Sequence, residues 1–376
     1  MLKIPDYKVE LRLDGTLIGD VRELAQNLTW VRRRAKVGVD EIDFTINDVL
    51  FDGWLRERGT DISSILKPLA LDCRVLRDGV AVMGGFLATM PAYSPNGTSA
   101  NLQLKFDGYL NYLANVYVRP IGLVQGRMDQ IITERINAAE AIAVAAGKGF
   151  GFTTGNIIPL PSVEHTFDNY KAVKEFIADR CDNVTGAGPF DVFFNPDRSY
   201  DIIPDGSFGE VISDYSIYYP TTQTGVSATS ISASEVSGFA SHIIGIGAGE
   251  ISSDASKNTV ITSEATNYDA VAQYGYSEAL LQESSISVQE TLNNNTKTQL
   301  ANSSDMIWKP DIALIGRQVA PTPNGERKIW LGDTITIINN EDMTGMTSGA
   351  FRVNELAVKV SATGAENIAP TLERVV

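Results

Sequence analysis

One stretch, residues 166–205, constrains the fold more than any other part of this sequence. Its first half carries apolar residues at three- and four-residue spacing (Tyr170, Val173, Phe176 and Ile177), which predicts a helix with one apolar face. Gly186-Ala-Gly-Pro189 ends the helix, because glycine and proline continue it poorly. Two short strands joined by turn residues follow. A unit of this size cannot bury its own apolar face, so it needs a partner elsewhere in the chain.

The strand after this helix alternates in character. Phe190, Val192 and Phe194 share one face, Asn195-Pro-Asp-Arg-Ser199 has turn chemistry, and residues 200–203 form the return strand. We predict that Phe176 packs against that apolar face in a single core.

Composition places the chain among ordinary globular proteins. With 376 residues, 43% of them apolar and 20% charged, it has room for two or three domains. The net charge of −15 argues against binding nucleic acid phosphates or an anionic membrane surface. The N-terminus lacks an apolar signal segment, so we expect synthesis and folding in the cytoplasm. No apolar run approaches the roughly 18 residues of a membrane-spanning helix.

Residues 1–117 have the pattern of short strands. Alternating apolar residues occupy 9–13, 42–46 and 102–106, and turn residues separate them. Asp78-Gly79 lies between two apolar runs and predicts a two-residue hairpin, because glycine adopts positive φ freely and aspartate tolerates it. Several short strands with such turns predict a barrel or sandwich.

The period changes near Pro120. Met128, Ile131, Ile132, Ile136, Ala139 and Ala143 fall on one helical face that ends at Gly147. Residues 221–256 are rich in Ser, Thr and Gly, and two interpretations remain open there: ordered strands with a polar face, which we favour, or a disordered linker. Ser287-Val-Gln-Glu290 has capping-box spacing and predicts a helix to about Leu300.

Strands return after Pro310. Phe351 and Val353 occupy odd positions, whereas Leu356, Val358 and Val360 occupy even ones. Because side chains alternate along a strand, this switch predicts a bulge near residues 354–355.

No arrangement of residues predicts an active site. His165 and His242 lie in unrelated settings, Cys73 and Cys181 suit buried positions, and Gly245-Ile-Gly-Ala-Gly249 lacks the following helix that a dinucleotide loop needs. Among 46 acidic residues, no carboxylate pair stands out as a general acid and base. We therefore expect a protein that is not an enzyme, with no catalytic residues, no cofactor and no metal.

Taken in order, the segments resemble the phage tail hub family, which comprises baseplate hubs of contractile tails and the N-terminal hub region of tail-associated proteins of long-tailed phages. Each motif is weak alone, and their order is what is specific. The motifs are Gly19-Asp-Val21 with Leu28-Thr-Trp-Val31, Arg77-Asp-Gly79 with Gly84-Gly85, Asp107-Gly-Tyr-Leu110, Phe190-Asp-Val192 with Asn195-Pro-Asp197, Gln273-Tyr-Gly275, Gly332-Asp-Thr-Ile-Thr336, Phe351-Arg-Val353 and Gly364.

The resemblance implies a mainly β fold with α/β insertions: two tail-tube-like β-barrels plus a composite α/β domain. Residues 1–117 would form the first barrel and 118–206 a helix and α/β domain. The second barrel would comprise 207–262 and 310–376, with 263–309 inserted. The Tyr274–Pro310 segment would then be the partner of the 166–205 unit.

The resemblance also implies a structural role in the virion, at the tail tip or baseplate of a phage, a gene transfer agent or a tail-like bacteriocin. Three copies, a homotrimer, would form a ring that joins the six-fold tail tube to a three-fold fibre or spike and lines the channel for DNA ejection. A distal tail or tail tube protein would bind above, and a fibre, spike or megatron-like protein below. DNA would pass through without specific binding.

Two alternatives remain open. A tail-tip receptor- or glycan-binding adhesin would need exposed aromatics, such as Trp54 or Tyr218-Tyr219, to form a platform. A small lytic or proteolytic tail protein is the other. The acidic excess suits a channel wall that repels DNA, and it equally suits an ordinary soluble surface.

Overall fold

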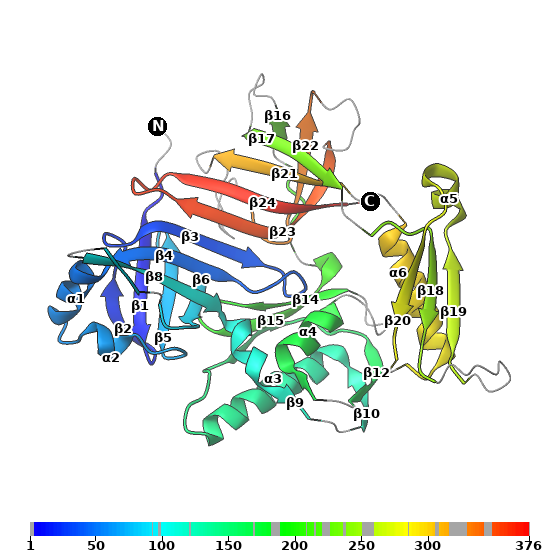
Figure 1. Ribbon diagram of the computed structural model, residues 1–376, viewed down its shortest axis with the longest axis horizontal. Coiled ribbons are helices and arrows are strands. Elements are labelled where there is room, and N and C mark those ends of the chain that lie inside the picture. Colours follow the sequence, from blue (N-terminus) through cyan, green and yellow to red (C-terminus); the bar gives the residue numbers. More distant parts are fainter. Residues whose placement is uncertain are drawn as a thin grey trace.

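The computed structural model describes residues 4–91, 93–96, 99–119, 122–167, 170–181, 189–207, 209–213, 216–219, 226–235, 238–249, 259–284, 286–304, 308–315, 329–341 and 348–375. Its largest element is a 14-stranded, mostly antiparallel sheet, and smaller sheets and helices flank it (Figure 1). The prediction of a mainly β fold with α/β insertions is confirmed.

The N-terminal part of the large sheet, which we call block 1, runs in the order β2-β1-β5-β6-β8-β4-β3. Asp14-Gly15 and Asp78-Gly79 make its tight hairpin turns with positive φ at both residues, as predicted for the second of them. The elements are β1 (Tyr7–Leu13), β2 (Thr16–Asp20), β3 (Gln26–Arg33), β4 (Glu41–Asn47), α1 (Asp48–Arg56), α2 (Ile62–Ile65), β5 (Leu71–Arg77), β6 (Val80–Leu87), β7 (Tyr93–Asn96) and β8 (Ser99–Gly108).

The C-terminal part, block 2, closes into a six-stranded ring. Each strand pairs with the next in the order β16-β17-β21-β24-β23-β22 and back to β16. The register of β23 shifts between Val353 and Glu355, which confirms the predicted bulge. The strands are β16 (Ile217–Tyr219), β17 (Val226–Glu235), β21 (Trp308–Ile315), β22 (Thr334–Asn339), β23 (Gly349–Val360) and β24 (Glu366–Arg374).

The two blocks share one topology. The spatial order β1-β5-β6-β8-β4-β3 of block 1 matches β16-β22-β23-β24-β21-β17 of block 2 when strands are paired off in chain order. Three details differ: β2 has no counterpart, β16 runs parallel to both neighbours, and the β16–β17 pairing that closes block 2 has no equivalent between β1 and β3 among the described strands. The strands of block 1 and those of block 2 are therefore two versions of the same sheet.

Block 1 and block 2 join through a single antiparallel ladder between β3 and β23, in which Trp30 faces Val358. One hydrophobic core runs beneath both blocks and includes Trp30, Phe44 and Phe351. The two blocks consequently fold as one continuous structure.

An α/β unit follows block 1 in the chain and packs beneath it (Figure 1). Its sheets are β11-β15-β14, β10-β12 and β13-β9. Its elements are η1 (Tyr109–Asn115), β9 (Tyr117–Val118), β10 (Gly122–Arg127), α3 (Met128–Ala145), β11 (Thr153–Ile157), β12 (Ser162–Phe167), β13 (Lys171–Ala172), α4 (Val173–Cys181), β14 (Phe190–Phe194), β15 (Ser199–Pro204) and η2 (Asp205–Ser207).

The predicted core of this unit is confirmed: Phe176, Phe190, Val192 and Phe194 are all buried in one cluster. The helix begins later than predicted, at Val173, because Lys171–Ala172 pairs with β9. Tyr170 is therefore not part of the helical face and is 70% exposed. The predicted end of the helix at Gly186 lies outside the described residues.

A third unit projects from the body at the right of Figure 1. Its strands form a separate sheet, β19-β18-β20, with a small core of its own. The elements are β18 (His242–Ile246), β19 (Thr262–Thr266), α5 (Tyr268–Tyr274), β20 (Glu278–Gln282) and α6 (Gln289–Ser303).

This pairing corrects two expectations. The second barrel was expected to include residues up to 262, but β18 pairs with the inserted strands and not with block 2. The 166–205 unit was expected to form a composite domain with Tyr274–Pro310, but it packs on η1 and α3 instead. Periodicity identified which faces are apolar and could not identify what covers them.

One local expectation in the projecting unit also changes. The N-cap of α6 is Val288, with no side-chain cap hydrogen bond, so Ser287 does not form the expected capping box. Gly245 allows α6 to lie close to β18: a Cβ there would be 2.3 Å from Thr296 Oγ1. Gly245 therefore serves helix–sheet packing, whereas Gly247 and Gly249 lie against residues 259–261 and Ile286.

Candidate functional site: buried ion pairs and an outward polar face at the block junction

Three groups of buried charged side chains hold the two blocks and the α/β unit together. The first is centred on Arg34, which follows β3 and is 1% exposed. Its Nε donates to Asp191 Oδ2 of β14 at 2.7 Å, and its Nη1 donates to Asn354 Oδ1, in the β23 bulge, at 3.0 Å. Its Nη2 also binds Asp205 of η2. One guanidinium therefore links block 1, the α/β unit and block 2.

At this centre, burial and the charge of Arg34 shift the pKa of Asp191 in opposite directions. Burial raises the pKa of Asp191 to about 6, although the hydrogen bond and positive charge of Arg34 act in the opposite direction. Arg352 Nη1 pairs with Asp205 Oδ2 at 2.7 Å. Separating the partners of such a buried pair leaves an uncompensated charge. These ion pairs therefore favour one arrangement of block 1, block 2 and the α/β unit.

The second group joins block 1 to the α/β unit. Asp72 of β5 accepts a hydrogen bond from Tyr109 Oη at 2.8 Å and one from Arg198 Nη2 at 2.9 Å. Burial raises the pKa of Asp72, and the charge of Arg198 opposes that shift. Gly84 makes the close approach possible, because a Cβ there would lie 2.9 Å from the Tyr109 ring and 3.0 Å from Pro196 Cα.

The third group joins block 1 to block 2 away from the β3–β23 ladder. Arg77 of β5 binds Glu366 of β24 in a bidentate manner, with Nε to Oε1 at 2.7 Å and Nη2 to Oε2 at 3.1 Å. Tyr7 Oη donates to the same carboxylate. Burial is the largest cause that raises the pKa of Tyr7, so the phenol stays protonated and can donate.

The outer side of the β8-β4-β3-β23 sheet is polar where its inner side is apolar. Pairing places Thr29 beside Asp43 and Lys359, Arg33 beside Glu355, and Thr45 beside Gln103. A shallow concavity of about 300 Å³ lies over this surface. We call it the junction face, defined by Asn27, Thr29, Val31, Arg33, Glu41, Asp43, Thr45, Gln103, Lys105, Glu355 and Lys359.

Arg33 and Lys105, two of the three cations on the junction face, form ion pairs with carboxylates, and the face carries three cations and three carboxylates in all. Arg33 pairs with Glu41 at 3.2 Å and with Glu355, and Lys105 pairs with Glu41 at 3.5 Å. The face is therefore neutral and polar, unlike the basic grooves that bind phosphate backbones.

The cysteines and histidines considered in the sequence lie apart from these three groups. Cys73 is buried, which raises the pKa of its thiol, and Cys181 is buried on α4; neither forms a disulfide. His242 Nδ1 lies 2.7 Å from Thr266 Oγ1, as a structural histidine does. His165, in β12, lies opposite Val124 of β10 in an antiparallel strand pair. Within the described ranges, no three His, Cys, Asp or Glu side chains are placed to hold a metal ion.

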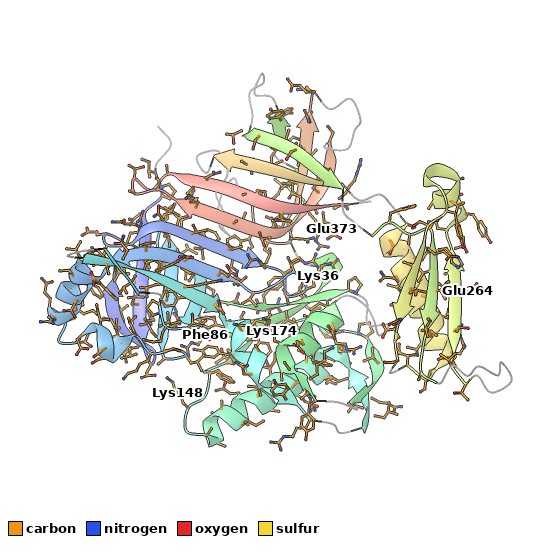
Figure 2. All side chains as sticks on the ribbon, viewed as in Figure 1. Lys36, Phe86, Lys148, Lys174, Glu264 and Glu373 are labelled. Atoms are coloured by element: carbon orange, nitrogen blue, oxygen red, sulfur yellow. The ribbon has the colours of Figure 1, made fainter. Side chains whose placement is uncertain are left out.

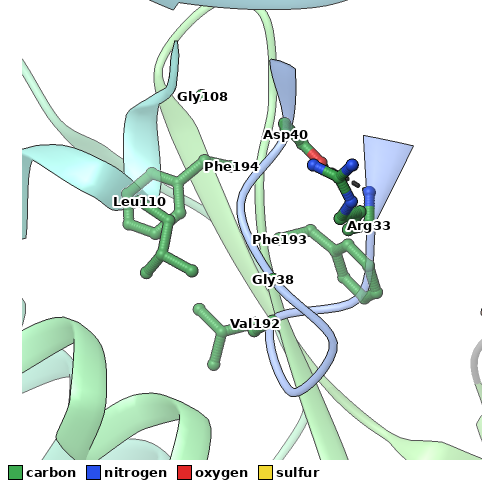
Figure 3. A pocket seen from close by; sticks show the side chains of 9 residues that line it. Arg33, Gly38, Asp40, Gly108, Leu110, Val192, Phe193 and Phe194 are labelled. Atoms are coloured by element: carbon green, nitrogen blue, oxygen red, sulfur yellow. Dashed lines mark hydrogen bonds between the residues drawn. The ribbon is translucent and has the colours of Figure 1, made fainter. Parts of the chain in front are cut away.

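A second, much smaller space has no room for a ligand. It lies where block 1 meets β14 and is lined by Arg33, Asp40, Leu110, Val192 and Phe194 among others (Figure 3). Its volume of about 10 Å³ holds at most one water molecule. None of the described helices is both long and apolar enough to cross a membrane. The side chains that fill the rest of the interior are drawn in Figure 2.

Comparisons with known proteins identify the fold. No family model and no curated relative matches the sequence. The structure is similar to a tail protein from Neisseria meningitidis MC58, with a TM-score of 0.63, 12% identity, and coverage of 98% of this chain and 96% of that chain. It is also similar to the 43 kDa tail protein of prophage MuSo2 from Shewanella oneidensis, with a TM-score of 0.61, 10% identity, and coverage of 97% and 98%.

A third similar structure is the prophage tail protein gp18 from Listeria monocytogenes EGD-e, with a TM-score of 0.54 and 11% identity; 97% of this chain and 94% of that chain are covered. The chain therefore has the fold of phage and prophage tail proteins along nearly its whole length. The resemblance found in the sequence is confirmed at the level of the fold.

Proposed function

We propose that this chain is the structural, non-enzymatic hub of a phage or phage-like tail tip or baseplate. One observation carries the proposal: two blocks of the same topology are fused through the β3–β23 ladder in a chain with a tail-protein fold. A six-fold tube offers six equivalent positions at its end. A chain that supplies two tube-like barrels fills all six with three copies, and the ring below is then three-fold.

The buried ion pairs suit this role because a connector between two symmetries must hold its blocks at one angle. Arg34, Arg77 and Arg198 each bind a carboxylate on another block or unit. In this proposal a distal tail or tail tube protein binds above the ring and a fibre, spike or megatron-like protein binds below. The protein is then a virion component, made in the host cytoplasm.

We further propose that the junction face lines the channel. The face crosses from block 1 to block 2 without interruption, as a channel wall built from both blocks would. Its cations are matched by carboxylates, so a passing duplex finds no run of free positive charge. The chain's net charge of −15 adds long-range repulsion.

The adhesin alternative has less support. Trp54, one of the aromatics it needs, is partly buried, with the Arg58 guanidinium 3.9 Å from its ring centroid. Tyr219 packs against the main core. Neither residue offers the flat exposed ring that stacks on a sugar.

Native mass spectrometry and electron microscopy of the purified chain test the proposal. We expect a trimer with a central channel. A chain that stays monomeric at tens of micromolar, or that binds glycans as a monomer, would contradict the hub. A zymogram on cell-wall substrate tests the absence of lytic activity.

A further inference from the structure

One edge of block 2 carries an unpaired stretch of strand. β17 pairs along one edge with β21, from Ala228 to Glu235. On its other edge β17 pairs with β16 only at Val226 and Ser227. Among the described residues, no strand pairs with the rest of that edge, which we call the outer edge of β17 and which spans residues 228–235.

The corresponding strand of block 1 indicates what such an edge binds. The counterpart of β17 in block 1 is β3, and β3 uses the edge opposite β4 to bind the C-terminal half of β23. That ladder is the junction between the blocks. The outer edge of β17 therefore stands at the end of block 2 as the β3 edge stands at the end of block 1.

Apart from the register shift at Thr229, the outer edge of β17 carries no protective feature. Exposed edge strands usually carry lysine, proline or inward charges that prevent pairing with other chains. β17 reads Val226-Ser-Ala-Thr-Ser-Ile-Ser-Ala-Ser-Glu235, with no proline, no basic residue and a single charge at its end. Thr229, Ser230 and Ser232 are exposed, small and polar. Such a strand is suited to accept a partner.

The matching donor strand is in block 1. The C-terminal half of β23 pairs with β24 just before the turn that joins them. In block 1 the strand just before the corresponding turn is β7, which pairs with β8 at Tyr93–Asn96. No further strand pairs with β7 in the described part of the chain. β7 is thus the block 1 counterpart of the β23 segment that binds β3.

We infer that the outer edge of β17 pairs with β7 of a second copy of this chain, antiparallel, as β3 pairs with β23 within one copy. The inference rests on the proposed ring. Within each copy the β3–β23 ladder joins block 1 to block 2, and between copies the β17–β7 ladder joins block 2 to the next block 1. Three copies then close with alternating internal and external ladders of one kind.

Cysteine cross-linking tests the ladder directly. Facing residues of adjacent strands have Cα atoms about 4.5–5.5 Å apart, within reach of a disulfide. The full chain carries Ser94→Cys in β7 together with a cysteine at each of residues 228–235 in turn. The native Cys73 and Cys181 are buried and do not compete. Ser63→Cys, on the exposed surface of α2, replaces the β17 cysteine in the control.

We expect one or two neighbouring positions to give covalent dimers and trimers on a non-reducing gel, and the Ser63→Cys control to give none. Sedimentation of each variant before oxidation shows whether a missing cross-link reflects a different interface or a chain that does not assemble. Trimers that do not cross-link at any position would overturn the β17–β7 ladder and leave the hub standing. Monomers at every concentration would overturn both.

A proline provides a second test. Ala233 faces Pro310 in the β17–β21 ladder, and proline has no N–H, so this pair cannot exchange two hydrogen bonds. We take this as a non-hydrogen-bonded pair, in which the Ala233 N–H is directed away from β21 and toward the outer edge. Ala233→Pro removes that donor, and we expect trimers to dissociate at a concentration at least about tenfold higher than in the parent chain, since one lost ladder bond of about 1.4 kcal/mol is tenfold. Unchanged dissociation would contradict the ladder.

Discussion

Arg34 and Asp191 are 157 residues apart in the chain, yet Arg34 Nε lies 2.7 Å from Asp191 Oδ2 in the interior. The arginine follows the strand that joins the two blocks, and the aspartate is in the buried strand of the α/β unit. Their pairing couples the angle between blocks to the position of that unit. The proposed hub needs this kind of fixed geometry more than it needs a cavity.

Arg34→Ala should lower the free energy of unfolding by about 3–5 kcal/mol, because it leaves Asp191 buried without its cation, whereas Asp205 keeps its ion pair with Arg352. Arg56→Ala is the matched control: Arg56 pairs with Asp52 on the surface and its side chain is 74% exposed. An exposed pair contributes less than about 1 kcal/mol. Chemical denaturation measures both, and equal losses for the two variants would contradict the structural role of Arg34.

Asp191 should make stability depend on pH. Its pKa is about 6 in the folded chain, above the ordinary value of 3.8, so the folded state binds the proton more tightly than the unfolded state. Its contribution to stability is therefore largest below about pH 4 and is lost as pH rises to about 6. Each pKa unit is worth about 1.4 kcal/mol, which gives a change of at most about 3 kcal/mol.

Comparison with Asp191→Asn isolates this effect from the other acidic residues. The difference in unfolding free energy, parent minus variant, should fall between pH 4 and pH 6 and stay level above pH 7. A difference that rises with pH would show that the Arg34 charge outweighs burial.

Phe176→Ala should cost about 3–5 kcal/mol, because Phe176 is 2% exposed within the core of the α/β unit. Tyr170→Ala is the control, since Tyr170 lies three residues before the helix and is 70% exposed. Denaturation of the full chain gives both values. A loss below roughly 1 kcal/mol for Phe176→Ala would mean that the core repacks around the change.

Replacing glycine by alanine should change the free energy of unfolding in opposite directions at two positions. Gly84→Ala forces a Cβ to within 2.9 Å of the Tyr109 ring, and overpacking of this kind costs about 1–3 kcal/mol. Gly53→Ala lies in α1 with nothing within 4 Å of the new Cβ, and alanine in a helix is more stable than glycine by about 1 kcal/mol. Thermal unfolding of the two variants should shift in opposite directions.

Local features of this fold were predictable from the sequence because their causes are local. Asp78-Gly79 specifies its own turn through positive φ, and the change of parity between Val353 and Leu356 specifies the bulge. The helical stripe from Met128 to Ala139 was equally clear, since each residue repeats at helical spacing.

Long-range features were not predictable in the same way. Nothing near Arg34 indicates a carboxylate 157 residues away, and nothing near β18 says that it leaves block 2 to pair with β19 and β20. Alternation of apolar and polar residues shows that a strand has an apolar face, but it does not indicate which strand lies beside it. The candidate site here consists of such pairings, and it therefore emerged only from the structure.

The last prediction concerns DNA passage through the assembled ring. If the junction face lines the channel, Thr29→Arg with Thr45→Arg adds two positive charges per copy to a wall that is otherwise neutral. Each phosphate–cation contact releases counterions and holds the strand, so a moving duplex should be slowed. We expect particles carrying this double variant to assemble normally and to release DNA at least several-fold more slowly, with the defect relieved at high salt. Ile142→Arg on α3, which is 45% exposed and away from the junction face, serves as the control. Normal release by the Thr29→Arg and Thr45→Arg particles would place the junction face outside the channel.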